Sequence, residues 1–177
     1  EGDQRDWHAF PRGRSCDVPL NDAVMDSFMM VTPSGTPPVN RRVAEWIETE
    51  LDDAIYQWHM QFRGDVRIAA DGDVTDVDID RHNLVLWGDP SSNRLLERLI
   101  EDLPLVWNRE SVELGGCVHD SANSVPVLIY PNPLNPDRYV VLNSGFTFAP
   151  YGNLSNALQT PKLPDWAVLD IRVSESS

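Results

Sequence analysis

Small polar residues that directly follow short apolar runs are the side chains best placed for chemistry in this chain. Gly88-Asp-Pro-Ser-Ser-Asn93 follows the run Leu84–Trp87, and Asn143-Ser144 ends a second run. Open α/β sheets place ligand-facing groups at the carboxyl ends of their strands. The pattern therefore predicts a polar ligand-binding rim at one sheet edge. Its members are Asp89, Ser91, Ser92, Asn93, Asn143 and Ser144, with Thr32 and Ser34 from a third strand end behind them.

The segment Gly88–Asn93 offers two kinds of chemistry. A helix beginning after it presents backbone N–H groups and the positive end of its dipole, to which an anion or a sugar hydroxyl can bind. Alternatively, Ser91 or Ser92 simply caps that helix. The segment has too few glycines for a phosphate-binding or dinucleotide-binding loop, and no lysine follows it, so the sequence does not favour a nucleotide cofactor.

A serine hydrolase is the second possibility that the residue types raise. The nucleophile elbow requires Gly-x-Ser-x-Gly, and the nearest match, Leu142-Asn-Ser-Gly-Phe146, lacks both outer glycines. No histidine follows His119, and nothing favours a combination such as His82, Asp89 and Ser144 over chance. A non-standard serine site around Ser144 or Ser92 remains an alternative. We predict no catalytic residue in the chain.

Metal and redox chemistry have weaker signals. The acidic stretch Asp71–Asp80 suggests calcium, but the EF-hand spacing is absent and a solvated turn fits as well. His8, His59, His82 and His119 form no metal-binding pair, so no metal or other cofactor is expected. Cys16 and Cys117 lie in no C-x-x-C motif. Both a disulfide between them and two reduced thiols stay open.

The composition of the chain limits the classes of partner that it can have. The chain has 177 residues, of which 41% are hydrophobic, and six tryptophans, which indicates a packed core. Its 28 acidic and 14 basic residues give a net charge of −14, which argues against nucleic acid as a partner. No apolar run approaches the length of a membrane span. The start at Glu1, without methionine or a recognisable leader, suggests a piece of a larger processed protein.

The periodicity of apolar residues predicts the elements that carry the rim. A strand is expected at Ser27–Thr32, and a long helix at Val39–Arg63, ended by Gly64. A strand at Asn83–Trp87 leads into a second helix that Pro104 stops. Further strands are expected at Val66–Ala69, Leu105–Trp107, Ser111–Leu114, Val125–Tyr130, Arg138–Leu142 and Trp166–Ile171, and a helical turn at Leu154–Gln159.

This order predicts the fold class. It is a three-layer α/β sandwich, Rossmann-like or flavodoxin-like, with a mixed and mainly parallel sheet. Residues 1–19 are expected to form an N-terminal arm packed on the domain, and residues 20–177 a single α/β domain.

Three long segments resemble a known kind of domain. They are Asn83–Asn93, Tyr130–Gly145 and Pro161–Asp170, within a resemblance that spans about Pro19 to Ile171. They are similar to a domain at the carboxyl end of large exported bacterial proteins. Those proteins resemble prolyl oligopeptidases and acetylxylan esterases and carry a separate α/β-hydrolase domain.

The resemblance implies an accessory, non-catalytic role. The chain would support the catalytic α/β-hydrolase domain of the same polypeptide, or bind a carbohydrate or other polar ligand at the sheet edge. It also implies an extracytoplasmic setting, periplasmic or secreted. It assigns no catalytic role to any residue of this chain.

Overall fold

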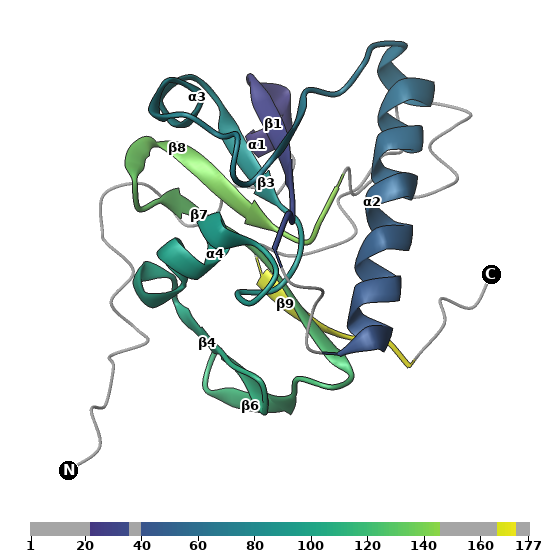
Figure 1. The fold of residues 1–177 in the computed structure, drawn as a ribbon, viewed down its shortest axis with the longest axis vertical. Coiled ribbons are helices and arrows are strands. Elements are labelled where there is room, and N and C mark those ends of the chain that lie inside the picture. Colours follow the sequence, from purple (N-terminus) through teal and green to yellow (C-terminus); the bar gives the residue numbers. More distant parts are fainter. Residues whose placement is uncertain (1–21, 36–39, 146–165, 173–177) are drawn as a thin grey trace.

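The computed structural model describes residues 22–35, 40–145 and 166–172 (Figure 1). Helices and strands alternate over the first half of this part of the chain, and strands dominate the second half. In chain order the elements are α1 (Asp22–Met25), β1 (Phe28–Thr32), α2 (Arg41–Phe62), β2 (Ile68–Ala70), α3 (Asp76–Arg81), β3 (Asn83–Leu86), α4 (Arg94–Leu99), the 3₁₀ helix η1 (Ile100–Asp102), β4 (Leu105–Trp107), β5 (Ser111–Leu114), β6 (Cys117–Asp120), β7 (Ser124–Asn132), β8 (Asn135–Leu142) and β9 (Trp166–Asp170).

A mixed six-stranded sheet forms the centre of the fold. Its strand order is β2-β1-β3-β8-β7-β9, with parallel pairing from β2 to β8 and antiparallel pairing of β7 with both β8 and β9. A second, antiparallel sheet contains β4, β5 and β6. The predicted α/β class with a mixed, mainly parallel sheet is confirmed.

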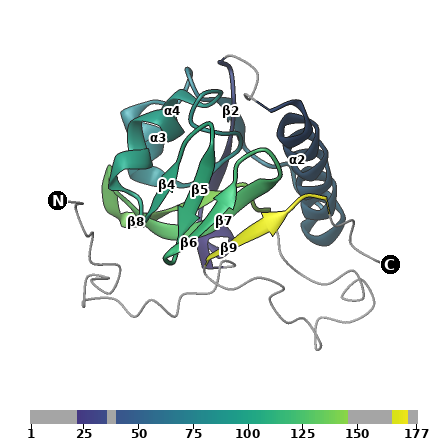
Figure 2. The same cartoon turned by 90° about the horizontal axis from the view of Figure 1, so that it is seen from below.

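Helices cover both faces of the central sheet (Figures 1 and 2). On one face, Val43, Ile47 and Ala54 of α2 and Ala23 and Val24 of α1 pack against β1, β3, β7 and β8. On the other face, α3, α4 and the small sheet bury a second apolar cluster. The central strands are apolar on both sides because both faces are covered: all four residues of β3 are buried. The arrangement is compatible with three layers.

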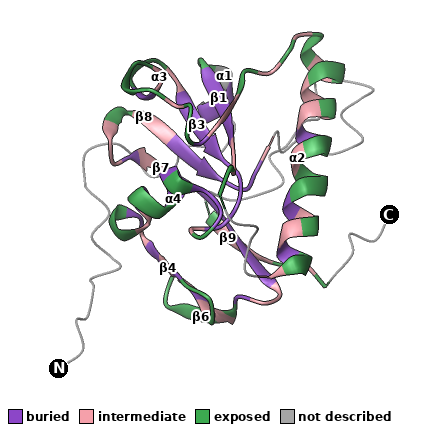
Figure 3. Cartoon of the chain, viewed as in Figure 1, coloured by how far each residue is buried: buried purple, intermediate pink, exposed green. Residues whose placement is uncertain are grey.

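Helix α2 closely matches the long helix that the apolar periodicity predicts. Asn40 caps its start, since the Asn40 side chain accepts a hydrogen bond from the N–H of Arg42. Its apolar stripe faces the sheet and its opposite face is exposed (Figure 3). The helix ends at Phe62, and Arg63, not Gly64, takes the left-handed conformation, with φ 53°. The predicted end at Gly64 is therefore wrong by one residue.

Other predictions meet the structure in part. The hairpin β7–β8 confirms the expected neighbouring connection through Pro131–Pro136, although both strands extend into it. Strand β6 was not predicted. The arm at residues 1–19 and the helical turn at Leu154–Gln159 lie outside the described residues. None of the helices that the structure describes is both long and apolar enough to cross a membrane.

Candidate ligand-binding site

The carboxyl ends of β2, β1, β3 and β8 lie side by side, because these strands are parallel neighbours. We call this side of the sheet the carboxyl edge. The chain leaves β1 for α2 on one face and leaves β3 for α4 on the other. The sheet thus has a topological switch point between β1 and β3, where α/β sheets form a crevice. The predicted rim residues do converge on this edge, although their contacts differ from one another.

Asn143 joins the ends of β3 and β8. Its side-chain Oδ1 accepts a hydrogen bond from the N–H of Gly88 at 2.9 Å, and its Nδ2 donates to the carbonyl of Gly88 at 3.0 Å. Asn143 is buried and has φ 46°, a conformation that asparagine tolerates better than most residues. Gly88 itself has φ 115°, where any side chain would be strained. Both polar groups of the Asn143 amide therefore serve the fold.

Asn93 performs the capping that the sequence suggested for Ser91 or Ser92. Its Oδ1 accepts from the N–H groups of Leu95 and Leu96, and its Nδ2 donates to the carbonyl of Trp87 at 2.9 Å. Asn93 is completely buried. Ser92, also buried, accepts a hydrogen bond from the N–H of Asp89 and donates to the Asp89 carbonyl, so it shapes the preceding turn.

Asp89 organises the turn that precedes α4. Its Oδ1 accepts hydrogen bonds from the N–H of Ser91 at 3.0 Å, from the Ser91 hydroxyl at 2.7 Å and from the N–H of Ser92 at 2.9 Å. Asp89 is only 8% exposed, whereas Ser91 lies on the surface. The acidic group is thus held in one orientation beside an accessible hydroxyl.

Thr32 and Ser34 reach the same edge but turn toward β2. The Ser34 hydroxyl and N–H both donate to Asp71, and Thr32 donates to the carbonyl of Ala69. Asp71 also accepts from the N–H of Arg94 at 2.6 Å. Burial by itself raises the pKa of Asp71, but the hydrogen bonds from Ser34, Arg94 and Gly72 outweigh it and hold that pKa below 3.8.

Sequence reasoning missed the role of Asp71, which it assigned to a solvated acidic stretch. The missed signal is its position directly after β2, the same pattern that singled out the other strand ends. The rest of that stretch has a structural use: Thr75 and Asp78 form a reciprocal capping box at the start of α3. Within the described residues, no three His, Cys, Asp or Glu side chains are arranged to hold a metal ion. Cys117 is an exposed free thiol, and Cys16 lies outside the described residues.

A cavity of about 500 Å³ opens at the switch point. Asp89, Pro90 and Ser91 form one wall, and the start of α2 forms another. The small sheet closes the third side. The cavity is lined by Asn40, Arg41, Val43, Asp89, Pro90, Ser91, Glu97, Trp107, Asn108, Arg109, Ser121 and Ala122. Of the eight predicted rim residues, Asp89 and Ser91 line it, and the other six do not.

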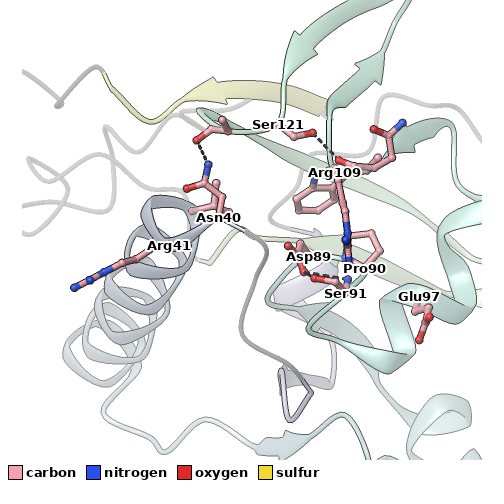
Figure 4. A pocket seen from close by; sticks show the side chains of 12 residues that line it. Asn40, Arg41, Asp89, Pro90, Ser91, Glu97, Arg109 and Ser121 are labelled. Atoms are coloured by element: carbon pink, nitrogen blue, oxygen red, sulfur yellow. Dashed lines mark hydrogen bonds between the residues drawn. The ribbon is translucent and has the colours of Figure 1, made fainter.

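Hydrogen bonds hold the cavity walls together. Asn40 Nδ2 donates to the carbonyl of Ala122 at 2.7 Å, which fixes the start of α2 to the turn after β6. The Ser121 hydroxyl donates to the carbonyl of Asn108 at 2.7 Å. Figure 4 shows Arg109 reaching from the β4–β5 turn toward Pro90 and Ser91, while Arg41 points away. The exposed Arg41 instead pairs with Glu45.

The alternative of a serine nucleophile finds no support in the contacts at this edge. Ser144 is buried, and its hydroxyl donates to the carbonyl of Gly145 at 3.4 Å. Ser92 has both hydroxyl functions engaged with the Asp89 backbone. No histidine among the described residues hydrogen-bonds to either serine. His82, the histidine named with Asp89 and Ser144, lies at the opposite end of β3.

No protein-family model matches the chain, and comparisons with curated proteins and with solved structures also found no match. Inference about function therefore depends on the cavity and on the side chains around it.

Proposed function

We propose that this domain binds a neutral, polyhydroxylated, carbohydrate-like ligand in the cavity at the switch point. The observation that carries the proposal is the cavity itself, which lies where α/β sheets bind ligands. Its volume is within the range of small-molecule sites. Its hydrogen-bonded walls keep polar groups in place before a ligand arrives, which lowers the cost of binding.

The charges of the lining residues favour a neutral ligand. Asp89 and Glu97 disfavour an anion, and Arg109 disfavours a cation. A sugar has adjacent hydroxyls, each able to donate and accept, so it can use a guanidinium and a carboxylate together. The buried indole of Trp107 adds apolar surface to the same lining.

The wider role that we propose is accessory. In this view the domain belongs to an exported hydrolase of the esterase or peptidase kind and holds polar substrate near a catalytic α/β-hydrolase domain of the same polypeptide. The engagement of Ser92 and Asn143 in the fold supports a binding role over a catalytic role at this edge.

Isothermal titration calorimetry with xylohexaose and cellohexaose tests the proposal, with acetate and phosphate as anionic comparators. Arg109→Gln and Ser91→Ala remove an exposed donor and an exposed hydroxyl of the cavity. Each is expected to weaken saccharide binding by about tenfold, the equivalent of one hydrogen bond to a charged or well-positioned group. Arg98→Gln, an exposed arginine of α4 outside the cavity, is the matched control.

Two results would contradict the proposal. One is the absence of heat with either saccharide at millimolar concentration. The other is binding that Arg109→Gln and Arg98→Gln weaken equally. Tighter binding of acetate or phosphate than of the saccharides would also contradict the proposal and would identify the ligand as an anion.

A further inference from the structure

Ser27 and His82 meet at the amino edge of the sheet, the edge opposite the cavity described above. Ser27 directly precedes β1 and His82 directly precedes β3. Because Phe28 pairs with Asn83 in parallel register, the residues before them are neighbours. The Ser27 hydroxyl lies 2.7 Å from His82 Nδ1. A backbone hydrogen bond from Asn83 to the Ser27 carbonyl holds the two strand starts together.

The neighbours of His82 bear on which of its ring nitrogens accepts a hydrogen bond. Arg67 Nη1 lies 3.5 Å from the same Nδ1, and a guanidinium can only donate. In the tautomer that carries its hydrogen on Nε2, Nδ1 can accept from both neighbours. In that tautomer the Ser27 hydroxyl donates its hydrogen to Nδ1. A hydroxyl at this distance from a ring nitrogen is the first contact that a nucleophile and its general base require.

The surroundings keep the ring neutral. Burial lowers the pKa of His82 below 6.5, and the charge of Arg67 lowers it further. Asp78 acts in the opposite direction, while Arg138 and Arg81 add to the lowering. At neutral pH the imidazole is thus ready to accept a proton.

Charges of both signs surround the hydroxyl: the Ser27 N–H donates to Asp26 Oδ1 at 2.7 Å, and the guanidinium of Arg67 lies beside the ring of His82. Arg67 stands beside the pair, and Arg138 lies close by, bonded to Asp26 at 2.8 Å. Because Arg138 is paired with Asp26, it is Arg67 that favours a negative charge developing on an oxygen near Ser27. Both guanidinium groups also disfavour an imidazolium, which is how they lower the pKa of His82.

A cleft of about 390 Å³ adjoins Ser27. Its polar lining comes from Asp26, Ser27, Asp65 and Arg67, and its apolar lining from Val24, Phe28, Trp58, Phe62 and Val66. The rings of Phe28 and Trp58 pack edge to face, with their centroids 4.7 Å apart. An apolar group placed in this cleft lies next to the serine hydroxyl, which is itself exposed.

From this geometry we propose that Ser27 and His82 are the nucleophile and general base of a second site, which cleaves carboxylic esters with a short apolar acyl group. Ser27 Oγ bonds to the ester carbonyl carbon while its proton passes to His82 Nδ1. The carbonyl oxygen becomes an oxyanion beside Arg67. The carbon–oxygen bond to the alcohol then breaks, and the leaving oxygen takes the proton from His82.

Water completes the cycle. It attacks the acyl group on Ser27, His82 accepts a proton from the water, and that proton returns to Ser27 Oγ as the carboxylic acid leaves. No oxidant, metal or other co-reactant enters the balance. The site is independent of the proposed saccharide cavity, because the two lie at opposite ends of β1 and β3.

The test uses the full chain, p-nitrophenyl butyrate, and a fluorophosphonate that labels activated serines, with peptide mapping of the labelled residue. The label is expected on Ser27. Ser27→Ala should abolish labelling at this position, and His82→Gln should slow labelling and ester turnover by about 10²–10⁴-fold, the contribution of a general base. His59→Gln, an exposed histidine of α2, is the matched control and should leave both unchanged.

The pH profile adds a readout that a structural role would not move. Turnover should rise through the lowered pKa of His82 and level off below neutral pH. Arg67→Gln removes one cause of that lowering, so the midpoint should move upward. The proposal is overturned if Ser27 stays unlabelled, if the label falls on Ser92 or Ser144, or if folded Ser27→Ala retains the wild-type rate. Circular dichroism of each variant separates loss of the site from loss of the fold.

Discussion

The two hydrogen bonds between the Asn143 side chain and the backbone of Gly88, which we call the clasp, give the sharpest prediction about stability. Asn143→Ala removes two hydrogen bonds and leaves the N–H and carbonyl of the buried Gly88 without their partner. An unsatisfied buried polar group costs about 1–3 kcal/mol. Alanine at φ 46° adds about 1 kcal/mol of backbone strain. We expect a total loss of about 3–5 kcal/mol in the free energy of unfolding, since water that enters the gap recovers part of the cost.

Urea unfolding followed by tryptophan fluorescence measures this loss. With a denaturant slope near 2 kcal/mol/M, the midpoint should fall by about 1.5–2.5 M. Asn143→Gly loses the same hydrogen bonds without the strain, so it should be about 1 kcal/mol less damaging than Asn143→Ala. Asn123→Ala, whose bonds to Arg42 and Asp120 lie at the surface, is the matched control. A loss below about 1 kcal/mol for Asn143→Ala would refute the role given to the clasp.

Three further predictions concern the same edge and the helix beside it. Asn93→Ala should lower the free energy of unfolding, measured by urea unfolding, by about 2–4 kcal/mol, because it removes the cap of α4 and the hydrogen bond to the Trp87 carbonyl. A loss as small as that of an exposed polar residue would contradict this. The pKa of Asp71 is depressed, so its contribution to stability is present above the ordinary value of 3.8 and is lost as the pH falls through the lower folded value. Asp71→Asn should therefore flatten the decline in stability as the pH is lowered below 3.8. Gly145→Ala should be destabilising because the new Cβ would clash with Ala54 Cβ, and Ala54→Gly should partly rescue it in a double-mutant cycle; additive effects would rule out the contact.

The sequence predicted helices and strands well where the spacing of apolar residues was regular. The stripe of Val43 and Ile47 marked α2, and short apolar runs marked β1 and β3. The predicted element boundaries were wrong where either of two neighbouring residues could end the helix. Arg63 adopts the left-handed conformation one residue before Gly64, which could also have done so. Strand β6 has no apolar alternation because it is largely exposed, so its pairing with β5 gave no periodic signal.

The candidate site was predictable in position but not in detail. Parallel neighbouring strands bring Asp89 and Asn143 to one edge, as the sequence indicated. Some of these polar groups are used in hydrogen bonds within the fold. Which ones are used depends on contacts between segments far apart in the chain, such as that between Asn143 and Gly88. The cavity also includes Asn40, the cap of α2, and Arg109, which follows the short strand β4 and could have been found by the same strand-end pattern.

The pairing of β3 with β8 has a consequence for the order of folding events. The hairpin β7–β8 and the meander of β4, β5 and β6 join neighbouring segments, so they can form early with little loss of chain entropy. Gly88 and Asn143, by contrast, lie 55 positions apart, so β3 and β8 must close a long loop before the amide of Asn143 can bind. We expect this clasp to form after the rate-limiting barrier, in which case its removal speeds unfolding and leaves the refolding rate almost unchanged.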